Sequence, residues 1–367
     1  MAEDGNGQGP PTVTGFAAMQ AVAALRRHNI AIAPILRRAG LSESDFEAGD
    51  GNPSHQRMSA IGQARFLDYA AEALEDSAFG LHLAQQTDPR DAGILFYVVS
   101  GGKNILEALT LFARYCRIVN EAARLKLIRT PEGLAVGISL VGLSRHSARQ
   151  NAEFGIAVML KALREVAGRN IRPTRAAFAH ARNSDLREFE RFFGCPVEFG
   201  RASSEGASFD LLLEFSNDAI ATPLITADQK LLNALQPFCD MAAKERKTAA
   251  GTLRAAVENE VEKLLPHGKA RMQAVAKALA LSARTLGRRL ADEGTSYADV
   301  VDQLRRSLAL QYLKERSVSL SQIAWLLGYE GSTSFNHAFK RWTGLSPAAA
   351  RDKKLLPASS DRRPGFT

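Results

Sequence analysis

The sequence lacks any long apolar run. No segment of the 367 residues approaches the roughly 18 consecutive apolar residues that a membrane-spanning helix requires. The first fifteen residues, MAEDGNGQGPPTVTG, carry acidic side chains and no apolar stretch, so no secretory signal is expected. These absences favour a cytoplasmic protein without a membrane partner.

Cysteine is scarce, and Cys116, Cys195 and Cys239 are scattered along the chain. Their odd number and wide spacing favour unpaired thiols in a reducing compartment over a disulfide framework. Neither they nor the seven histidines show metal-ligand spacing such as Cys-x-x-Cys or His-Glu-x-x-His. We therefore expect no metal site and no cofactor.

Catalytic motifs are lacking as well. The sequence has no Walker loop and no dinucleotide fingerprint, and Gly142-Leu143-Ser144 lacks the closing glycine of a nucleophile elbow. His146 beside Arg145 would suit an anionic ligand, but a histidine on a surface loop is the simpler interpretation. We expect that the protein is not an enzyme.

Positive charge is abundant, but only in the last third of the chain. Residues 246–354 hold 19 Lys and Arg against 10 Asp and Glu, whereas residues 1–245 hold 26 against 28. The net charge of +8 therefore comes from one basic module attached to a nearly neutral body. Such a distribution is typical of nucleic-acid binding, although a solvated basic surface without a partner is the alternative.

The first part of the chain mixes helical and strand patterns. Segments 124–129 and 134–140 flank Thr130-Pro131-Glu132-Gly133, which predicts a hairpin. We expect a multidomain protein: an α+β N-terminal domain followed by an all-α domain. The expected boundaries are 1–14 for a disordered N-terminus, 15–225 for the α+β domain, 226–250 for a linker broken at Pro237, 251–353 for the basic all-α domain and 354–367 for a loose tail.

An internal repeat lies in the basic module. Val275-Ala276 and Leu279 recur 48 positions later as Ile323-Ala324 and Leu327; Leu286 and Leu290 recur 49 later as phenylalanines; and Gly294 and Ser296 recur 50 later as Gly344 and Ser346. Each copy has an apolar stripe, a turn, a second stripe and a closing glycine. The repeat therefore predicts two helix-turn-helix units, each with a second helix suited to the major groove of DNA.

The outward faces of the two second helices give the candidate DNA contacts. Arginine suits guanine and asparagine suits adenine, while the remaining basic side chains suit phosphates. A solvated face holding helical ion pairs is the alternative for the arginines, but acidic neighbours are few. The expected base contacts are Ala283, Arg284, Gly287, Arg288, Ser332, Thr333, Asn336 and His337, and the expected phosphate contacts are Arg289, Lys340 and Arg341.

A longer helix is expected between the units, from Ser296 to about Leu313, with apolar side chains on one side. It would pack against both units and fix their separation. Two recognition helices held apart by one rigid helix would enter successive major grooves about 34 Å apart. The chain would then need no second copy for two groove contacts, although a homodimer stays open.

The repeat region resembles the AraC/XylS family of transcription regulators. The similarity covers about a hundred residues and is carried by Val275–Leu290, Gly294–Tyr297, Ile323-Ala324, Gly328-Tyr329 and Ala338–Trp342. Gly287 stands where the family usually has a longer polar side chain, and His337 where arginine is common. The region before it resembles the regulatory domain called arabinose-binding, through Ala92–Tyr97 and Phe192–Phe199. That label names a family and does not establish arabinose as a ligand.

The resemblance implies a regulator, with an activator favoured, that binds double-stranded promoter DNA and recruits RNA polymerase. A small-molecule effector or dimerisation would act on the first domain, and the effector-binding residues are unknown. The alternative is a ligand-binding or interaction protein that does not read DNA. The duplicated units and the basic bias argue against it.

Overall fold

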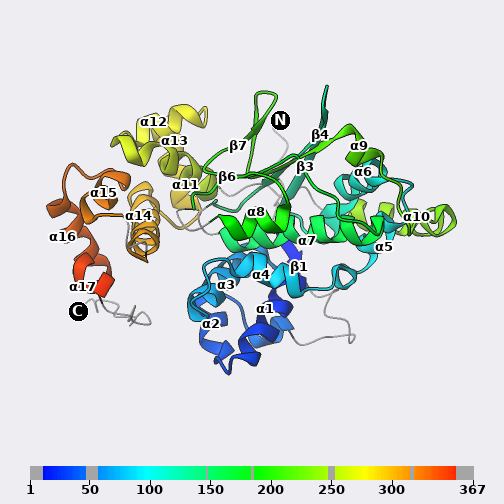
Figure 1. Ribbon diagram of the computed structural model, residues 1–367. Helices are drawn as coiled ribbons and strands as arrows, with labels where there is room; N and C mark the ends of the chain where they lie inside the picture. The colour runs from blue at the N-terminus through cyan, green and yellow to red at the C-terminus, as the bar shows by residue number, and fades with distance from the viewer. Residues whose placement is uncertain are drawn as a thin grey trace, which may run out of the picture. The chain divides into compact units, whose positions relative to one another are not determined.

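The computed structural model describes residues 11–46, 57–145, 148–182, 186–246, 253–314 and 318–352. The chain divides into two compact units, Met1–Thr252 and Leu253–Thr367. Figure 1 shows helices and strands together in the first unit and helices in the second. This matches the expected succession of an α+β domain and an all-α domain.

A five-stranded sheet forms the centre of the first unit, in the order β3-β4-β9-β5-β6. The pairs are antiparallel except β5 with β6. The predicted hairpin is confirmed, with Thr130 opposite Gly133 at its turn. The strands of this sheet are β3 (Ala123–Thr130), β4 (Gly133–Leu140), β5 (Arg175–Phe178), β6 (Val197–Phe199) and β9 (Leu211–Ser216).

Both faces of this sheet are covered. The hairpin of β7 (Ala202–Ser204) and β8 (Ala207–Phe209) packs on one face through Phe209, whose ring leaves no room for a side chain at Gly137. Helices lie along the other face, as Figure 1 shows for α7 and α8. These helices include α6 (Ile105–Tyr115), α7 (Arg149–Ala167), α8 (Arg187–Phe193) and α9 (Asn217–Ala221).

The remaining elements of the first unit join the same core. Residues 12–14 are a correction to the expected disordered N-terminus, because β1 (Thr12–Thr14) pairs with β2 (Arg57–Ser59). The others are α1 (Phe16–Arg27), α2 (Ile32–Ala39), η1 (Glu43–Phe46), α3 (Ala60–Ala73), α4 (Phe79–Gln86), η2 (Pro89–Ala92), α5 (Ile94–Ser100) and η3 (Cys116–Ile118).

The segment expected to be a linker, 226–250, differs from that expectation. It contains α10 (Gln229–Glu245), which runs through Pro237 and buries Leu232 and Cys239 in the first unit. The hydroxyl of Tyr115 donates a hydrogen bond of 2.8 Å to Asp240, which fixes the helix to α6. Proline removes one backbone donor, but packing on α5 and α6 supplies the lost stability. Residues 354–367, expected as a loose tail, lie outside the described residues.

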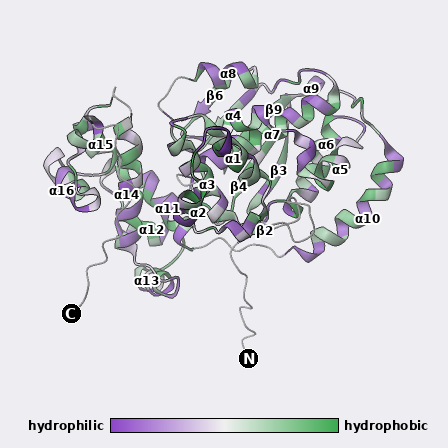
Figure 2. Cartoon of the chain, turned by 90° about the horizontal axis from the view of Figure 1, so that it is seen from below, coloured by the Kyte–Doolittle hydropathy of each residue, from purple (hydrophilic) through white to green (hydrophobic). Residues whose placement is uncertain are grey.

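The second unit consists of short helices around one apolar core. Figure 2 shows α14 between the pair α12 and α13 and the pair α15 and α16. Its elements are α11 (Leu253–Leu264), η4 (Leu265–His267), α12 (Met272–Ala278), α13 (Ala283–Asp292), α14 (Tyr297–Lys314), α15 (Leu320–Leu326), α16 (Ser332–Thr343) and α17 (Pro347–Asp352).

Candidate nucleic-acid interface

The first helix-turn-helix unit consists of α12 and α13. Val275 and Ala276 on α12 meet Leu286 and Leu290 on α13, and all four side chains are buried. These are the residues that the repeat placed on the inward stripes, so the predicted faces are confirmed. Because the inward face is fixed by packing, the opposite face of α13 is left to solvent or to a ligand.

A tight turn joins the two helices. Ala280 has a left-handed backbone with φ of 55°, and the Leu281 amide donates to the carbonyl of Ala276 at 2.8 Å. Ser282 then caps α13, since its Oγ accepts a hydrogen bond from the Thr285 amide. The turn therefore closes one helix and starts the next within four residues.

The second helix-turn-helix unit, α15 and α16, repeats this geometry. Ser319 and Gln322 form a reciprocal capping box at the start of α15. Gly328 has φ of 73°, and the Tyr329 amide donates to Ala324 at 2.9 Å, which matches the bond of the first copy 48 residues earlier. The sequence repeat is thus a repeat of hydrogen bonds as well as of apolar side chains.

The ends of the second helices also correspond. Gly294 and Gly344 are both left-handed, with φ of 72° and 76°, and each ends a helix as predicted. Two residues later, Ser296 and Ser346 accept hydrogen bonds from the amides of Asp299 and Ala349, which begin the following helices. The repeat therefore extends into α14 and α17.

Three arginines dominate the exposed face of α13. Arg284, Arg288 and Arg289 are exposed, and within the described residues none of them forms a hydrogen bond or ion pair. Ala283 and Gly287, also expected at this face, are half-buried. A side-chain carbon at Gly287 would lie 3.0 Å from the Met272 Cε, so the glycine permits close packing of α12 on α13.

The exposed face of α16 is less charged. Ser332, Thr333, Asn336 and His337 are all exposed, which places the four expected base contacts on the solvent side of the helix. The hydroxyl, amide and imidazole groups offer both donors and acceptors to base edges. This face can therefore read bases but contributes little net charge.

The two basic residues at the end of α16 differ in their surroundings. Lys340 is exposed, and within the described residues its side chain forms no hydrogen bond or ion pair, whereas the Arg341 guanidinium donates to the Asp302 carboxylate of α14 at 2.6 Å. The Trp342 indole also donates to Asp302, at 3.4 Å. Asp302 therefore offsets part of the positive charge of Arg341.

Helix α14 contacts and stabilises the second helix-turn-helix unit, α15 and α16. The Arg305 Nε donates to the Leu327 carbonyl at 2.9 Å, and its guanidinium lies 4.7 Å from the centre of the Tyr329 ring. Val300, Leu304 and Leu308 bury the apolar side of the helix in the shared core. The predicted linker helix therefore contacts the turn between α15 and α16 through Arg305 and stabilises it.

Helix α11 has a role that the sequence reasoning missed. It buries Val257 and Val261 against α12, α13 and α14. The Glu293 carboxylate at the end of α13 accepts hydrogen bonds from the amides of Leu253 and Arg254, at 2.8 and 3.0 Å. A carboxylate at a helix N-terminus is favourable, so Glu293 joins the start of α11 to the end of α13.

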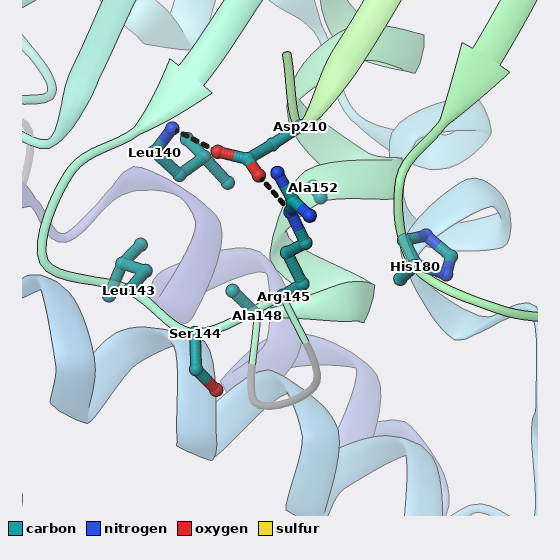
Figure 3. A pocket seen from close by; sticks show the side chains of 8 residues that line it. All are labelled: Leu140, Leu143, Ser144, Arg145, Ala148, Ala152, His180 and Asp210. Carbon is teal, nitrogen blue, oxygen red and sulfur yellow. Dashed lines mark hydrogen bonds and ion pairs between the residues drawn. The ribbon is translucent and has the colours of Figure 1, made fainter. Parts of the chain in front are cut away.

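The first structural unit, Met1–Thr252, contains a small cavity, drawn in Figure 3, that is lined by apolar side chains together with Ser144, Arg145, His180 and Asp210. The Asp210 carboxylate lies between the Leu140 amide and the Arg145 guanidinium, at 2.7 Å from each. His180 lines the same cavity, whose volume of about 10 Å³ is room for about one water molecule. The Glu153 carboxylate lies 3.4 Å from the imidazole of His180; burial raises the pKa of Glu153, while Arg182 at 3.0 Å opposes that rise.

Among the described residues, no group of three or more His, Cys, Asp or Glu side chains is arranged to hold a metal ion. The three cysteines are free thiols, and burial raises the pKa of Cys116 to about 12. Nor does any helix of the described chain have the length and apolar content to cross a bilayer.

Two family profiles match the chain. One, described as the arabinose-binding domain of AraC transcription regulators, matches residues 30–210, and the other, a helix-turn-helix domain, matches residues 275–353. Together they span more than two thirds of the chain. The second profile covers α12 to α17, the elements that carry the repeat.

Several known proteins are similar to most of the chain. An ornithine utilization regulator of Pseudomonas aeruginosa is 28% identical over 301 residues, which are 79% of this chain and 85% of that protein. The HTH-type transcriptional regulator VirS of Mycobacterium tuberculosis is 27% identical over 320 residues, 87% and 90% of the two chains. The crystal structure of the regulator CdpR from Pseudomonas aeruginosa has a TM-score of 0.43 and 24% identity, covering 92% and 98%.

The repeat, its buried stripes and its exposed basic helix agree with these two profiles and with the relatives. The homologues are transcription regulators, which favours a regulator over an enzyme. The chain belongs to the AraC/XylS family and is a DNA-binding transcription regulator with tandem helix-turn-helix units.

Proposed function

We propose that α13 and α16 each enter the major groove of promoter DNA and that α13 supplies most of the sequence specificity. The observation that carries this proposal is the exposed row of Arg284, Arg288 and Arg289, which has no acidic partner within the described residues. Arg284 and Arg288 lie four residues apart on one helix face, where each is able to bond the O6 and N7 of a guanine. Arg289 contacts phosphate.

On α13, Ala283 and Gly287 are half-buried, with Gly287 against Met272 of α12, so we propose that they line the edge of the surface that approaches the bases. On α16, base contacts come from Ser332, Thr333, Asn336 and His337, and Lys340 contacts phosphate. Arg341 contributes less than a free arginine because Asp302 shares its charge. We expect the second helix-turn-helix unit to lean more on backbone contacts, through Lys340 and in part Arg341, and to contribute less to specificity than α13 does.

Selection of DNA from a random pool tests this division of roles. The wild-type chain defines the preferred site, and Arg288→Ala is then compared with Lys340→Ala on that site and on scrambled DNA. We expect Arg288→Ala to cost about 1–3 kcal/mol on the preferred site and to relax the base preference at one position.

Lys340→Ala is the matched control, because it also removes one exposed cation. It should weaken binding to preferred and scrambled DNA alike and lower the slope of log affinity against log salt by about 1. Equal loss of base preference in both variants would refute the proposed division. If neither variant binds less tightly than the wild type, the interface itself is wrongly placed.

The regulatory role has a second part. We propose that the protein acts in the cytoplasm, that the domain ahead of the helix-turn-helix units senses a small molecule, and that the bound protein activates transcription through RNA polymerase. A profile named for arabinose binding and a relative named for ornithine utilization support a small-molecule signal. L-arabinose and L-ornithine are the first probes, and DNA affinity and transcription that respond to neither would remove that support.

A further inference from the structure

Four arginines gather beside the start of β3 in the first structural unit, Met1–Thr252. They come from four elements: Arg57 from β2, Arg117 from η3, Arg124 from β3 and Arg246 from the end of α10. The Arg57 guanidinium donates to the carbonyl of Ile118 in η3 at 2.8 Å, and the Arg117 guanidinium donates to the Arg246 carbonyl at 2.7 Å. These bonds bring the four positive charges of this arginine cluster together.

Glu121 is the carboxylate that faces the arginine cluster, and its oxygens are already engaged. Its Oε1 lies 3.3 Å from Nη2 of Arg57, and its Oε2 accepts hydrogen bonds from the amide and the hydroxyl of Thr12, at 3.0 and 2.8 Å. Within the described residues neither Arg117 nor Arg246 forms an ion pair. The cluster therefore holds more positive charge than its carboxylate neutralises.

The positive charges lie close enough to act on one another. Burial lowers the pKa of Arg57, and the charge of Arg246 lowers it further, against the attraction of Glu121. Burial also lowers the pKa of Arg124, and the charge of Arg117 acts in the same direction. Like charges in a partly desolvated place disfavour the charged form of each other, so a negative charge at this place would stabilise the fold.

Two donors of the arginine cluster lack an acceptor among the described residues. The Nε atoms of Arg117 and Arg246 are inaccessible to solvent, and neither has a hydrogen-bond partner in this part of the chain. Buried donors in folded proteins almost always have an acceptor. A rotation of either long side chain would present its Nε–H beside an Nη–H, which are the parallel donors that bind an oxyanion.

We propose that Arg57, Arg117 and Arg246 bind a small doubly charged oxyanion of the phosphate class, either inorganic phosphate or the phosphate group of a metabolite. All three side chains are half-buried, so an ion from solvent reaches them while the protein reduces its screening by water. Arginine suits this ligand because its planar fork matches the oxygens of phosphate.

A bound dianion would have two effects on the first structural unit. It would offset the repulsion between Arg57 and Arg246, and its oxygens would supply the acceptors that the two Nε atoms lack. Because Arg246 ends α10, the anion would also hold the C-terminal end of the last helix of this unit. The inference depends neither on the DNA contacts nor on the sensing role proposed above.

Isothermal titration calorimetry of the full chain with inorganic phosphate tests the site, slightly above neutral pH and at an ionic strength held constant with chloride. The wild type should bind one phosphate per chain. Arg246→Gln should lower the affinity at least about 10-fold, because a charged hydrogen bond is lost. Arg129→Gln is the matched control: it removes one exposed arginine at the other end of β3, about 17 Å from Arg124, and should bind phosphate as the wild type does.

The melting temperature separates a binding role of Arg246 from a structural one. Phosphate at millimolar concentration should raise the melting temperature of the wild type above its value in chloride, and it should leave that of Arg246→Gln unchanged. In chloride alone Arg246→Gln should melt no lower than the wild type, because the substitution removes the repulsion on Arg57. A purely structural arginine would give the opposite: a lower melting temperature in chloride and an unchanged response to phosphate.

Two further comparisons identify the source of the phosphate group. Glycerol 3-phosphate represents a metabolite, and the tighter binder of this ester and inorganic phosphate indicates the source; tight binding of either supports the site. If Arg246→Gln lowered the slope of log DNA affinity against log salt by about 1, the arginine would contact a DNA backbone, and the proposal would be overturned. It would also be overturned by a wild type that binds neither probe, or by an equal loss of affinity in Arg246→Gln and Arg129→Gln.

Discussion

His82 is the residue whose charge depends most clearly on the fold. Its Nδ1 lies 2.7 Å from Asp76 and its Nε2 lies 2.6 Å from Glu188, so one ring joins the start of α4 to α8. The hydrogen bond to Asp76 is the largest cause that raises the pKa of His82, to about 9, and the bond to Glu188 adds to it against partial burial. The folded protein therefore holds this imidazole protonated at neutral pH.

A pH dependence of stability follows from this pKa. The folded pKa lies above the ordinary value of about 6.5, so the stabilisation is complete below pH 6.5 and is lost as the pH rises to 9. We expect the melting temperature of His82→Gln to lie below that of the wild type at pH 6, and the two to converge near pH 9.5. Calorimetry of both proteins across this range measures the difference.

The ring itself gives an independent measurement. Its proton resonance should titrate with a midpoint near 9, and the other histidines serve as internal references. A midpoint near 6.5 for His82, or a melting difference that stays constant from pH 6 to 9.5, would contradict the proposed protonation.

At the scale of elements, the two turns of the repeat use different residues for one conformation. Ala280 in the first turn and Gly328 in the second are both left-handed. An alanine in this left-handed conformation costs roughly 1–2 kcal/mol relative to glycine. Glycine, however, loses more conformational entropy on folding, so the gain in stability from replacing alanine by glycine is smaller than this cost. We therefore expect Ala280→Gly to raise the free energy of unfolding of the second structural unit, Leu253–Thr367, by about 0.5–1 kcal/mol.

The reverse change should destabilise. A side-chain carbon at Gly328 would lie 2.5 Å from the Leu265 carbonyl oxygen, and the backbone would be strained as well. Gly328→Ala should therefore cost more than about 2 kcal/mol. Urea unfolding followed by tryptophan fluorescence reports both changes, because both tryptophans of the chain, Trp325 and Trp342, lie in the second unit. If the two substitutions changed the free energy of unfolding by small, equal and opposite amounts, the left-handed backbone would not be strained.

These elements also show what the sequence was able to predict. The hairpin of β3 and β4 was predictable because Thr130-Pro131-Glu132-Gly133 specifies its own turn, and the repeat was predictable because its stripes recur at fixed spacing. Such signals are local. The left-handed Ala280 was not visible, since alanine carries no turn signal of its own and only the hydrogen bond to Ala276 reveals it.

The features that the sequence did not predict depend on contacts between residues far apart in the chain. Pro237 suggested a break, but contacts of α10 with α5 and α6 keep the helix continuous. The role of α11 depends on Glu293, which lies forty residues away in the sequence. Of the candidate DNA contacts, the exposed positions on α13 and α16 were predictable from periodicity. The pairing of Arg341 with Asp302 was not, because it joins two helices across the domain.

At the scale of the whole molecule, the two units have separate apolar cores that share no residue. Each core should therefore unfold in its own transition. Tryptophan fluorescence follows the second unit, and calorimetry of the full chain follows both. On the proposed interface, a DNA fragment selected by the protein binds the second structural unit, so it should raise the fluorescence-detected midpoint and leave the other transition in place.

The size of this shift can be estimated. DNA at about 100 times its dissociation constant stabilises the bound unit by about 2.7 kcal/mol, which corresponds to a rise of roughly 10 °C or more for a unit of about 100 residues. Scrambled DNA at the same concentration is the control and should produce a smaller shift, which shrinks further as salt is added. A single transition that moves as a whole with DNA would show that the units fold as one body, and the separation of their cores would then have no thermodynamic consequence.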